Sequence, residues 1–176
     1  MTTHVAGTLI EFGGPPGTGK STLARDLADR MGAVLLRIDE IEAAMRRNGL
    51  TPQQTGIAAY SVAHNVAYSH LRRGMTVIAD AVNPVAAARD GWRHLAADCG
   101  AKHVVIEVQC LDEVEHRRRV EQRGSDIPGW THPTWDETRR QIADYEPRTD
   151  DRLVVDSTRT ISACQTEIAR HFNIAN

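Results

Sequence analysis

Apolar residues along this chain follow two different spacings. Short apolar runs, such as 8–12, 33–38 and 76–79, stand between longer stretches in which apolar residues recur every three or four positions. Runs of the first kind are typical of buried strands, and stretches of the second kind are typical of helices with one buried face. Strands that alternate with helices favour a parallel sheet with helices on both faces. The pattern therefore predicts an α/β fold.

Turn and capping residues mark where each element begins and ends. Gly or Pro closes most of the helical stretches, and Thr, Asn or Asp opens several of them. In the helix that follows Thr51, one side carries Ile57, Tyr60, His64, Tyr68 and Leu71. The expected strands are 8–12, 33–38, 76–79, 102–108 and 152–155. The expected helices run through Leu23, Leu27 and Met31, and over 40–48, 51–73, 83–99, 112–123, 134–146 and 160–172.

Length and composition fit a single domain, 1–176. The chain has 176 residues, 41% of them hydrophobic, so it can bury a substantial core. No repeat, linker or low-complexity stretch divides it. Its three cysteines, Cys99, Cys110 and Cys164, show no metal or redox spacing, and we expect reduced thiols.

Charge and hydropathy restrict the expected partners. A formal net charge of -2 and a sequence pI of about 6.4 provide no overall basic field, so no nucleic-acid partner is expected. No apolar run approaches the roughly 20 residues that cross a membrane, and residues 1–7 lack the basic start and apolar core of a signal peptide. We expect a soluble cytoplasmic protein without a membrane partner, and the sequence leaves its oligomeric state open.

Residues 14–21, Gly-Pro-Pro-Gly-Thr-Gly-Lys-Ser, match the phosphate-binding pattern G-x-x-x-x-G-K-[ST] at every position. The motif stands between an expected strand and an expected helix, which is the context that its chemistry requires. Glycines let backbone N–H groups turn toward phosphate oxygens, and the helix start adds the positive end of its dipole. Lys20 is expected to reach the β- and γ-phosphates, and the Ser21 hydroxyl to hold Mg²⁺. The expected nucleotide-binding residues of this loop are Gly14, Pro15, Pro16, Gly17, Thr18, Gly19, Lys20, Ser21 and Thr22.

Two aspartates directly follow expected strands. Asp39 directly follows the run 33–38, and Asp80 directly follows the run 76–79. Ligands of open parallel sheets collect at the carboxyl ends of the strands, so both residues are candidates for a site beside the nucleotide. Asp39 suits a base for an acceptor hydroxyl, and Asp80 suits substrate binding or a water-mediated contact to Mg²⁺. Each aspartate could instead cap the helix that follows it.

Arginines are concentrated in 117–123, directly before a loop at 124–133 that is rich in Gly and Pro. Arg119 and Arg123 are four residues apart and therefore share a helix face. Guanidinium groups that lead into a mobile loop suit a lid, approximately 117–138, that neutralises charge on a transferring phosphoryl group. The same arginines could instead form a solvated face paired with neighbouring glutamates.

At these motifs the chain resembles the small P-loop kinases related to gluconate kinase, adenylylsulfate kinase, chloramphenicol phosphotransferase and the kinase domain of polynucleotide kinase. The resemblance spans nearly the whole chain and is specific at the motifs. It implies a P-loop NTPase fold, with a five-stranded parallel sheet in the order 2-3-1-4-5 flanked by helices, and a lid that closes over ATP. It also implies Mg²⁺ as a cofactor and a small-molecule hydroxyl as the phosphate acceptor.

The resemblance assigns roles to single residues. Residues 38–45 resemble the segment in which chloramphenicol phosphotransferase carries its hydroxyl-activating aspartate, which falls on Asp39. Residues 77–84 are similar to the substrate-side segment of polynucleotide kinase, and Arg119 and Arg123 fall on the lid arginines that contact ATP in that enzyme. Together with the motif and the strand-end positions, this makes Lys20, Asp39, Arg119 and Arg123 the expected catalytic residues, Asp39, Glu42, Asp80, Asn83 and Arg89 the expected substrate-binding residues, and Ser21 and Asp80 the expected metal ligands.

One position departs from the polynucleotide kinase pattern. That enzyme has an arginine for the nucleic-acid phosphate three residues beyond its catalytic aspartate, whereas this chain has Glu42. The departure counts against a polynucleotide substrate. We expect the acceptor pocket between the helices of 40–74 and the segment 80–89, with His64 and Tyr68 among its candidate lining residues.

Two functions of different classes remain open. The first is an ATP-dependent kinase of a small hydroxylated metabolite or antibiotic. The second is a nucleotide-operated ATPase or switch that acts on a protein partner. The sequence has no Asn-Lys-x-Asp motif for guanine, which disfavours GTP, and no strand ending in the paired Asp-Glu of hexameric AAA+ machines.

Overall fold

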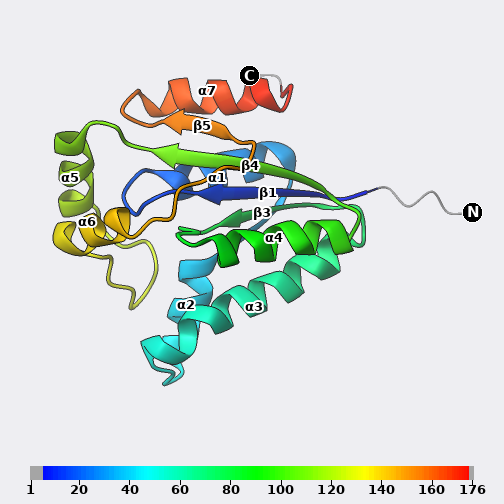
Figure 1. Cartoon of the computed structure of the whole chain (residues 1–176), viewed down its shortest axis with the longest axis horizontal. Coiled ribbons are helices and arrows are strands. Elements are labelled where there is room, and N and C mark those ends of the chain that lie inside the picture. Colours follow the sequence, from blue (N-terminus) through cyan, green and yellow to red (C-terminus); the bar gives the residue numbers. More distant parts are fainter. Residues whose placement is uncertain (1–5, 175–176) are drawn as a thin grey trace, which may run out of the picture.

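Five strands form one parallel sheet in the computed structural model, which describes residues 6–174 (Figure 1). All the strand pairs are parallel and their order is β2-β3-β1-β4-β5, so the expected α/β fold and strand order are confirmed. The strands are β1 (Thr8–Gly13), β2 (Val34–Arg37), β3 (Thr76–Asp80), β4 (Lys102–Gln109) and β5 (Leu153–Asp156).

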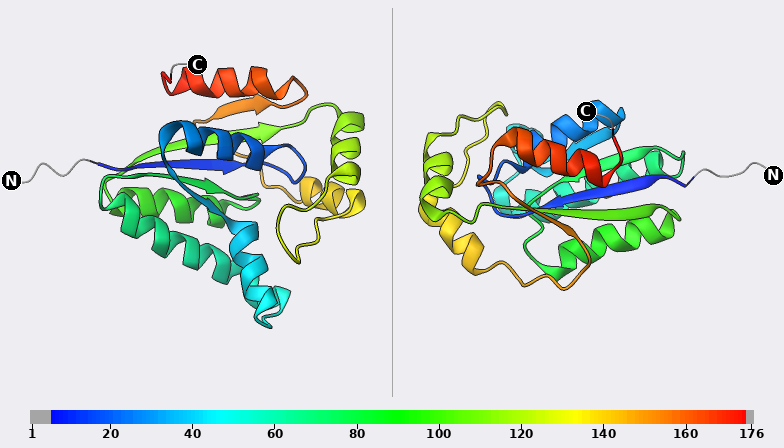
Figure 2. Two further views of the ribbon diagram at one scale, coloured as in Figure 1. Left: turned by 180° about the vertical axis from the view of Figure 1, so that it is seen from behind. Right: turned by 90° about the horizontal axis from the view of Figure 1, so that it is seen from above.

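Helices enclose the sheet. They are α1 (Lys20–Met31), α2 (Ile38–Arg47), α3 (Pro52–Leu71), α4 (Ala86–Asp98), α5 (Glu113–Gln122), α6 (Trp135–Ala143) and α7 (Ile161–His171). One face of the sheet packs against α1 and α7 and the other against α3 and α4, while α5 and α6 lie beyond the carboxyl ends of the strands (Figures 1 and 2). Within residues 6–174, no helix is long and apolar enough to span a bilayer.

The central strand β1 supplies both layers of the core. Leu9 packs in the layer that contains Leu71 of α3, whereas Ile10 packs in the layer that contains Leu23 of α1. Successive side chains of a strand point to opposite faces, so one strand serves two layers. Each large apolar side chain that is fully buried stabilises the fold by about 1.5–3 kcal/mol. The sheet therefore holds its carboxyl edge, where the P-loop begins, in a fixed position.

The buried side of α3 is formed mainly by small residues, although Leu71 belongs to it and Tyr60 packs against the same core. Ile57 is 86% exposed and Tyr68 is 44% exposed, so neither anchors the helix. Small side chains let α3 approach the sheet and α4 closely, and close packing outweighs the size of the residues on the opposite face. The fully buried residues of α3 are Thr55, Ala59, Ala63, Ala67 and Leu71.

The junction between β2 and α2 is tighter than the sequence pattern predicts. The strand ends at Arg37 and the helix begins at Ile38, with no intervening loop. Asp39 therefore lies in the first turn of α2 rather than directly after the strand. A carboxylate in this turn is favoured by the helix dipole.

Candidate active site

Glycines give the P-loop its shape. Gly14, Gly17 and Gly19 have φ values of 125°, 80° and 87°, a region that side chains disfavour. A Cβ atom on Gly14 would lie 2.1 Å from the carbonyl oxygen of Val108, and one on Gly17 would lie 2.4 Å from Cγ2 of Val120. Positions 14 and 17 therefore require glycine for space as well as for backbone conformation. The resulting concave loop fits a phosphate chain, because its backbone N–H groups can face the anion.

Lys20 is held inside this loop. Its side chain is buried, and its Nζ donates a hydrogen bond of 3.1 Å to the carbonyl oxygen of Pro15. The Thr18 hydroxyl donates to the same carbonyl at 3.0 Å. Burial lowers the pKa of Lys20, while the nearby Asp80 and Asp39 carboxylates raise it. A cation in this position can replace its contact to Pro15 with a phosphate oxygen.

A cavity of about 980 Å³ opens beside the P-loop. Its walls come from the P-loop and α1, from α2, from the end of α5, and from the loop between α5 and α6 together with the start of α6. Gly14, Pro15 and Thr18 are not part of its wall and shape the loop from behind. The predicted site residues that line the cavity are Pro16, Gly17, Gly19, Lys20, Ser21, Thr22, Asp39, Glu42, Arg119 and Arg123.

The Asp39 carboxylate reaches the cavity from the first turn of α2. Burial raises the pKa of Asp39, and the nearby Lys20 and Arg37 cations oppose this rise. A carboxylate with a raised pKa is a stronger base than an exposed one. Asp39 can therefore accept a proton from a hydroxyl placed in the same cavity as Lys20.

Asp80 lies behind the cavity rather than in its wall. It ends β3 beside β1, where it pairs with Phe12, and it is 5% exposed. Its Oδ2 lies 3.4 Å from Nε of Arg37. Direct substrate contact at Asp80 has no support in this geometry. Its influence on the pKa of Lys20 places it close to the phosphate end, so a water-mediated contact to Mg²⁺ stays a prediction.

The arginines of α5 divide into two groups. Arg117 donates to Glu121 at 2.8 Å and Arg118 donates to Glu115 at 2.7 Å, as expected for a solvated face, although Arg118 also reaches the edge of the cavity. Arg119 lines the cavity. Its Nε donates a hydrogen bond of 2.6 Å to Glu115, and its Nη1 donates one of 3.2 Å to the Ser157 hydroxyl, so its guanidinium is held in place.

Arg123 also lines the cavity, but it lacks such support. Its Nε and Nη2 atoms are buried and have no hydrogen-bond partner in the part of the chain that the structure describes. Burial lowers the pKa of Arg123, whereas the Asp39 carboxylate raises it, and a guanidinium remains charged under ordinary conditions. A buried cation without a partner is costly. An anionic ligand in the cavity would supply the missing acceptors.

Arg37 and Asp126 line the cavity, although neither residue was predicted as part of a site. Arg37 is 5% exposed and lines the cavity. Its Nη1 donates to Glu40 at 2.7 Å and to Asp126 at 2.9 Å, and Asp126 also accepts from Arg25 at 2.8 Å. An arginine that ends an otherwise apolar strand was the available signal, because such a charge needs a partner.

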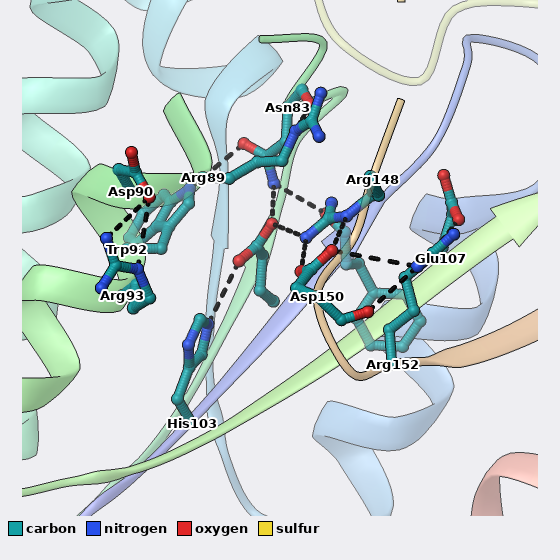
Figure 3. Close-up of polar contacts among 12 residues, drawn as sticks. Asn83, Arg89, Asp90, Trp92, Arg93, His103, Glu107, Arg148, Asp150 and Arg152 are labelled. Atoms are coloured by element: carbon teal, nitrogen blue, oxygen red, sulfur yellow. Dashed lines mark hydrogen bonds and ion pairs between the residues drawn. The ribbon is translucent and has the colours of Figure 1, made fainter. Parts of the chain in front are cut away.

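Asn83 and Arg89 lie in the interior instead of the expected substrate pocket (Figure 3). Asn83 has φ 51°, is fully buried, and does not cap α4, which begins at Ala86. Its amide donates to Glu11 at 3.0 Å and accepts from Trp92 at 3.2 Å. Because these bonds occupy its donor and acceptor, we leave Asn83 out of the proposed substrate site.

Arg89 has an equally structural set of contacts. Its guanidinium donates to the carbonyl oxygens of Asn83, Pro84, Glu146 and Pro147 at 3.1, 2.9, 2.6 and 3.2 Å. These bonds fix the segment after α6 to the segment before α4. Arg89 is likewise left out of the substrate site.

The expected acceptor pocket is also displaced from its predicted place. Of the segment 80–89, Val82 is the one residue in the cavity wall. His64 packs against Gly91 and Trp92 between α3 and α4, and Tyr68 faces outward. Glu42 is the candidate that does line the cavity.

The donor set fits Mg²⁺ held mainly by nucleotide phosphates and water. Within residues 6–174, no group of three or more His, Cys, Asp or Glu side chains could hold a metal by itself. Mg²⁺ in nucleotide sites keeps several waters and uses few protein ligands, so this observation is compatible with such a site. Ser21 lines the cavity, and its hydroxyl stays the predicted direct ligand of Mg²⁺.

A family model described as an AAA domain, AAA_33, matches residues 9–147. The chain belongs to this family. Uncharacterized proteins of Mycobacterium bovis and Mycobacterium tuberculosis are 32% identical over 124 residues, which is 64% of this chain. This chain matches only 24% of the length of those relatives. Adenylyl-sulfate kinase of Myxococcus xanthus is 35% identical over 120 residues, covering 65% of this chain and 64% of that protein.

Solved structures of small kinases share the fold. A sugar kinase from Janibacter has a TM-score of 0.71 at 18% identity and covers 96% of each chain. The adenylylsulfate (APS) kinase CysC of Mycobacterium tuberculosis, solved with AMPPNP and APS, has a TM-score of 0.68 at 17% identity and covers 96% of this chain and 98% of its own. The chain therefore has the fold of the small P-loop kinases.

Proposed function

We propose that this protein is an ATP- and Mg²⁺-dependent kinase that transfers the γ-phosphate of ATP to a hydroxyl group of a small molecule in the cytoplasm. The observation that carries the proposal is that Lys20, Asp39 and Arg123 line one cavity. A phosphate-binding cation, a carboxylate of raised pKa and a cation without a partner are the groups that phosphoryl transfer to an alcohol needs. The AMPPNP in the APS kinase structure supports ATP as the nucleotide.

The residues divide the work of the reaction. The P-loop and Lys20 bind the β- and γ-phosphates, and Ser21 helps to hold Mg²⁺, which neutralises phosphate charge when it is bound. Asp39 orients the acceptor hydroxyl and takes its proton as the oxygen bonds to the γ-phosphorus. The bond from that phosphorus to the β–γ bridging oxygen breaks, and ADP leaves with the bridging oxygen. Arg119 and Arg123 stabilise the charge that spreads over the phosphoryl oxygens.

A product screen tests the proposal. Purified protein is incubated with ATP, Mg²⁺ and pooled hydroxylated metabolites and antibiotics, and mass spectrometry detects phosphorylated products. We expect at least one product that the Lys20→Ala variant does not form. ATP hydrolysis that a protein partner stimulates and that no small molecule changes would favour the alternative, an ATPase switch acting on a partner.

A further inference from the structure

Helix α2 presents three charged side chains to the cavity at helical spacing. Asp39, Glu42 and Arg46 all line it and are three and four residues apart, so they share one face. Helix α2 runs away from the sheet (Figure 1), with Asp39 in its first turn and Arg46 in its last turn. Trp130, which stacks on Arg46, and His132 of the loop between α5 and α6 line the same cavity. We call these five residues the acceptor end of the cavity.

Arg46, the arginine of the acceptor end, already has an ion-pair and a stacking partner. Arg46 donates from Nη2 to Glu42 at 2.5 Å, and its Cζ lies 4.8 Å from the ring centroid of Trp130. The stacking occupies one face of the guanidinium, and the ion pair neutralises its charge. Next to it, Arg47 donates to the carbonyl oxygen of Pro128 at 2.7 Å. Both side chains hold the loop against α2.

Arg37 is also already paired with carboxylates. Its guanidinium lies 2.7 Å from Glu40, 2.9 Å from Asp126 and 3.4 Å from Asp80. Three carboxylates around one buried cation leave no net positive charge for a ligand. Arg123, whose Nε and Nη2 lack a hydrogen-bond partner among the described residues, acts on Lys20, Asp39 and His132, whereas the cation beside Glu42 is Arg46.

Free hydrogen-bond acceptors remain at the acceptor end. Glu42 is 14% exposed at its side chain and receives hydrogen bonds from Arg46 and Thr55, at 2.5 and 2.8 Å, both at Oε1. Its Oε2 is thus available to a ligand. Asp39 receives no side-chain hydrogen bond from the described residues. Burial lowers the pKa of His132, and the nearby Arg123 cation lowers it further.

We propose that the phosphate acceptor is a neutral polyol or an amine-bearing hydroxyl compound, such as an aminosugar, and that Glu42 selects it through hydrogen bonds to hydroxyl or ammonium groups. The inference rests on the proposed kinase function. The cation beside Glu42 is the paired and stacked Arg46, so the open Oε2 of Glu42 accepts hydrogen bonds from N–H and O–H donors and repels an anionic group placed against it. A phosphorylated, sulfated or carboxylated acceptor would meet this repulsion, so the acceptor end discriminates by charge.

Compounds with matched carbon skeletons test this specificity. The full chain is incubated with ATP, Mg²⁺ and three separate pools, made of neutral sugars and polyols, of aminosugars and aminoglycosides, and of sugar acids and sugar phosphates. Mass spectrometry then measures the phosphorylated products of each pool. We expect products from the neutral or the amine-bearing pool. Products formed chiefly from the anionic pool would overturn the inference and leave the kinase function standing.

Failure of the function itself has a different signature. If no pool gives a product while the protein binds ATP and hydrolyses it in response to a protein partner, the kinase proposal fails and the acceptor inference fails with it. The two outcomes are distinguishable. Products from the anionic pool contradict only the acceptor inference, whereas the absence of any phosphorylated product contradicts the kinase function itself.

Variants of Glu42 identify the selecting residue. Glu42→Gln keeps an oxygen for Arg46 and Thr55, so the fold is preserved, but it removes the charge. We expect the KM for the acceptor to rise about 10- to 100-fold with little change in the KM for ATP. Glu42→Lys should shift the preference toward anionic acceptors. The control Glu113→Gln removes an exposed carboxylate on α5, outside the cavity wall, and should leave both KM values unchanged. An unchanged acceptor KM in Glu42→Gln would contradict the assignment.

Discussion

Arg37 at the end of β2 donates a hydrogen bond of 2.9 Å to Asp126, which lies 89 residues later in the loop between α5 and α6. The same carboxylate accepts from Arg25 of α1 at 2.8 Å. Asp126 thereby joins the loop to α1, which follows the P-loop, and to β2, which directly precedes the helix turn that carries Asp39. The position of the loop and the charges of the cavity are coupled through this one carboxylate.

Asp126→Asn should loosen the loop. The variant keeps the shape of the side chain but loses the two charge-assisted bonds, and we expect a stability loss of about 1 kcal/mol, reduced by the partial exposure of the pair. Hydrogen exchange over residues 124–134 should become several-fold faster. The exposed Asp151→Asn is the matched control. Exchange equal to that of the unmodified protein would show that Asp126 does not hold the loop.

The same contact has a defined pH dependence. Hydrogen bonds from Arg37 and Arg25 lower the pKa of Asp126 to about 2. Because the folded value lies below the unfolded one, the contact stabilises the protein fully above about pH 4 and is lost as the pH falls toward 2. Acid unfolding of Asp126→Asn should lack this contribution. Identical acid profiles for the two proteins would contradict the expectation.

Asp39→Asn should separate nucleotide binding from phosphate transfer. The amide occupies the same space but cannot take a proton, so transfer to the acceptor should fall at least about 100-fold while ATP affinity changes little. In the unmodified protein the rate should fall as the pH drops through the pKa of Asp39, which burial raises. The variant should lose this limb of the pH–rate profile. Normal transfer by Asp39→Asn would show that another group is the base.

Gly17→Ala should impair the P-loop. The new Cβ would lie 2.4 Å from Cγ2 of Val120, and the φ of 80° is unfavourable for alanine. We expect a stability loss of about 1–3 kcal/mol and at least a tenfold loss of ATP affinity. Gly56→Ala is the control, since nothing lies within 4 Å of its added Cβ and it sits inside α3. That variant should gain about 0.5–1 kcal/mol. Denaturant unfolding measures the stability of both variants, and equal changes in their free energy of unfolding would refute the steric account.

His116 should make stability depend on pH. It is 3% exposed, and its Nε2 lies 2.7 Å from the carbonyl oxygen of Pro16, to which the neutral ring donates. Burial lowers the pKa of His116, although the bond to Pro16 opposes this. The stabilisation is therefore complete above the unfolded pKa of about 6.5 and is lost as the pH falls below it. The free energy of unfolding should drop less between pH 7.5 and 5.5 in His116→Gln. An unchanged drop would be contrary to this account.

Local chemistry explains what the sequence predicted well. The P-loop could be found because its glycines, lysine and serine act within eight consecutive residues. Asp39 could be placed to within one turn, because a strand and a helix meet there. The strand order followed from the resemblance to small kinases, since composition alone does not order the strands of a sheet.

Contacts between distant segments explain the errors. Asn83 was expected in the substrate site at the start of a helix, but its amide is bound to Glu11 and Trp92 in the interior. The buried face of α3 was set by close packing of alanines, which hydrophobicity alone underestimates. The bond between Arg37 and Asp126 depends on how the loop folds back, and no spacing in the sequence encodes it.

Titration calorimetry of ATP in magnesium buffer tests the central claim most directly, because it does not require the acceptor to be known. We predict saturable binding of one ATP per chain and a loss of at least tenfold in affinity in Lys20→Ala, whose missing cation contacts the phosphates. Absence of nucleotide binding by the folded protein, or equal affinity in the variant, would contradict the account.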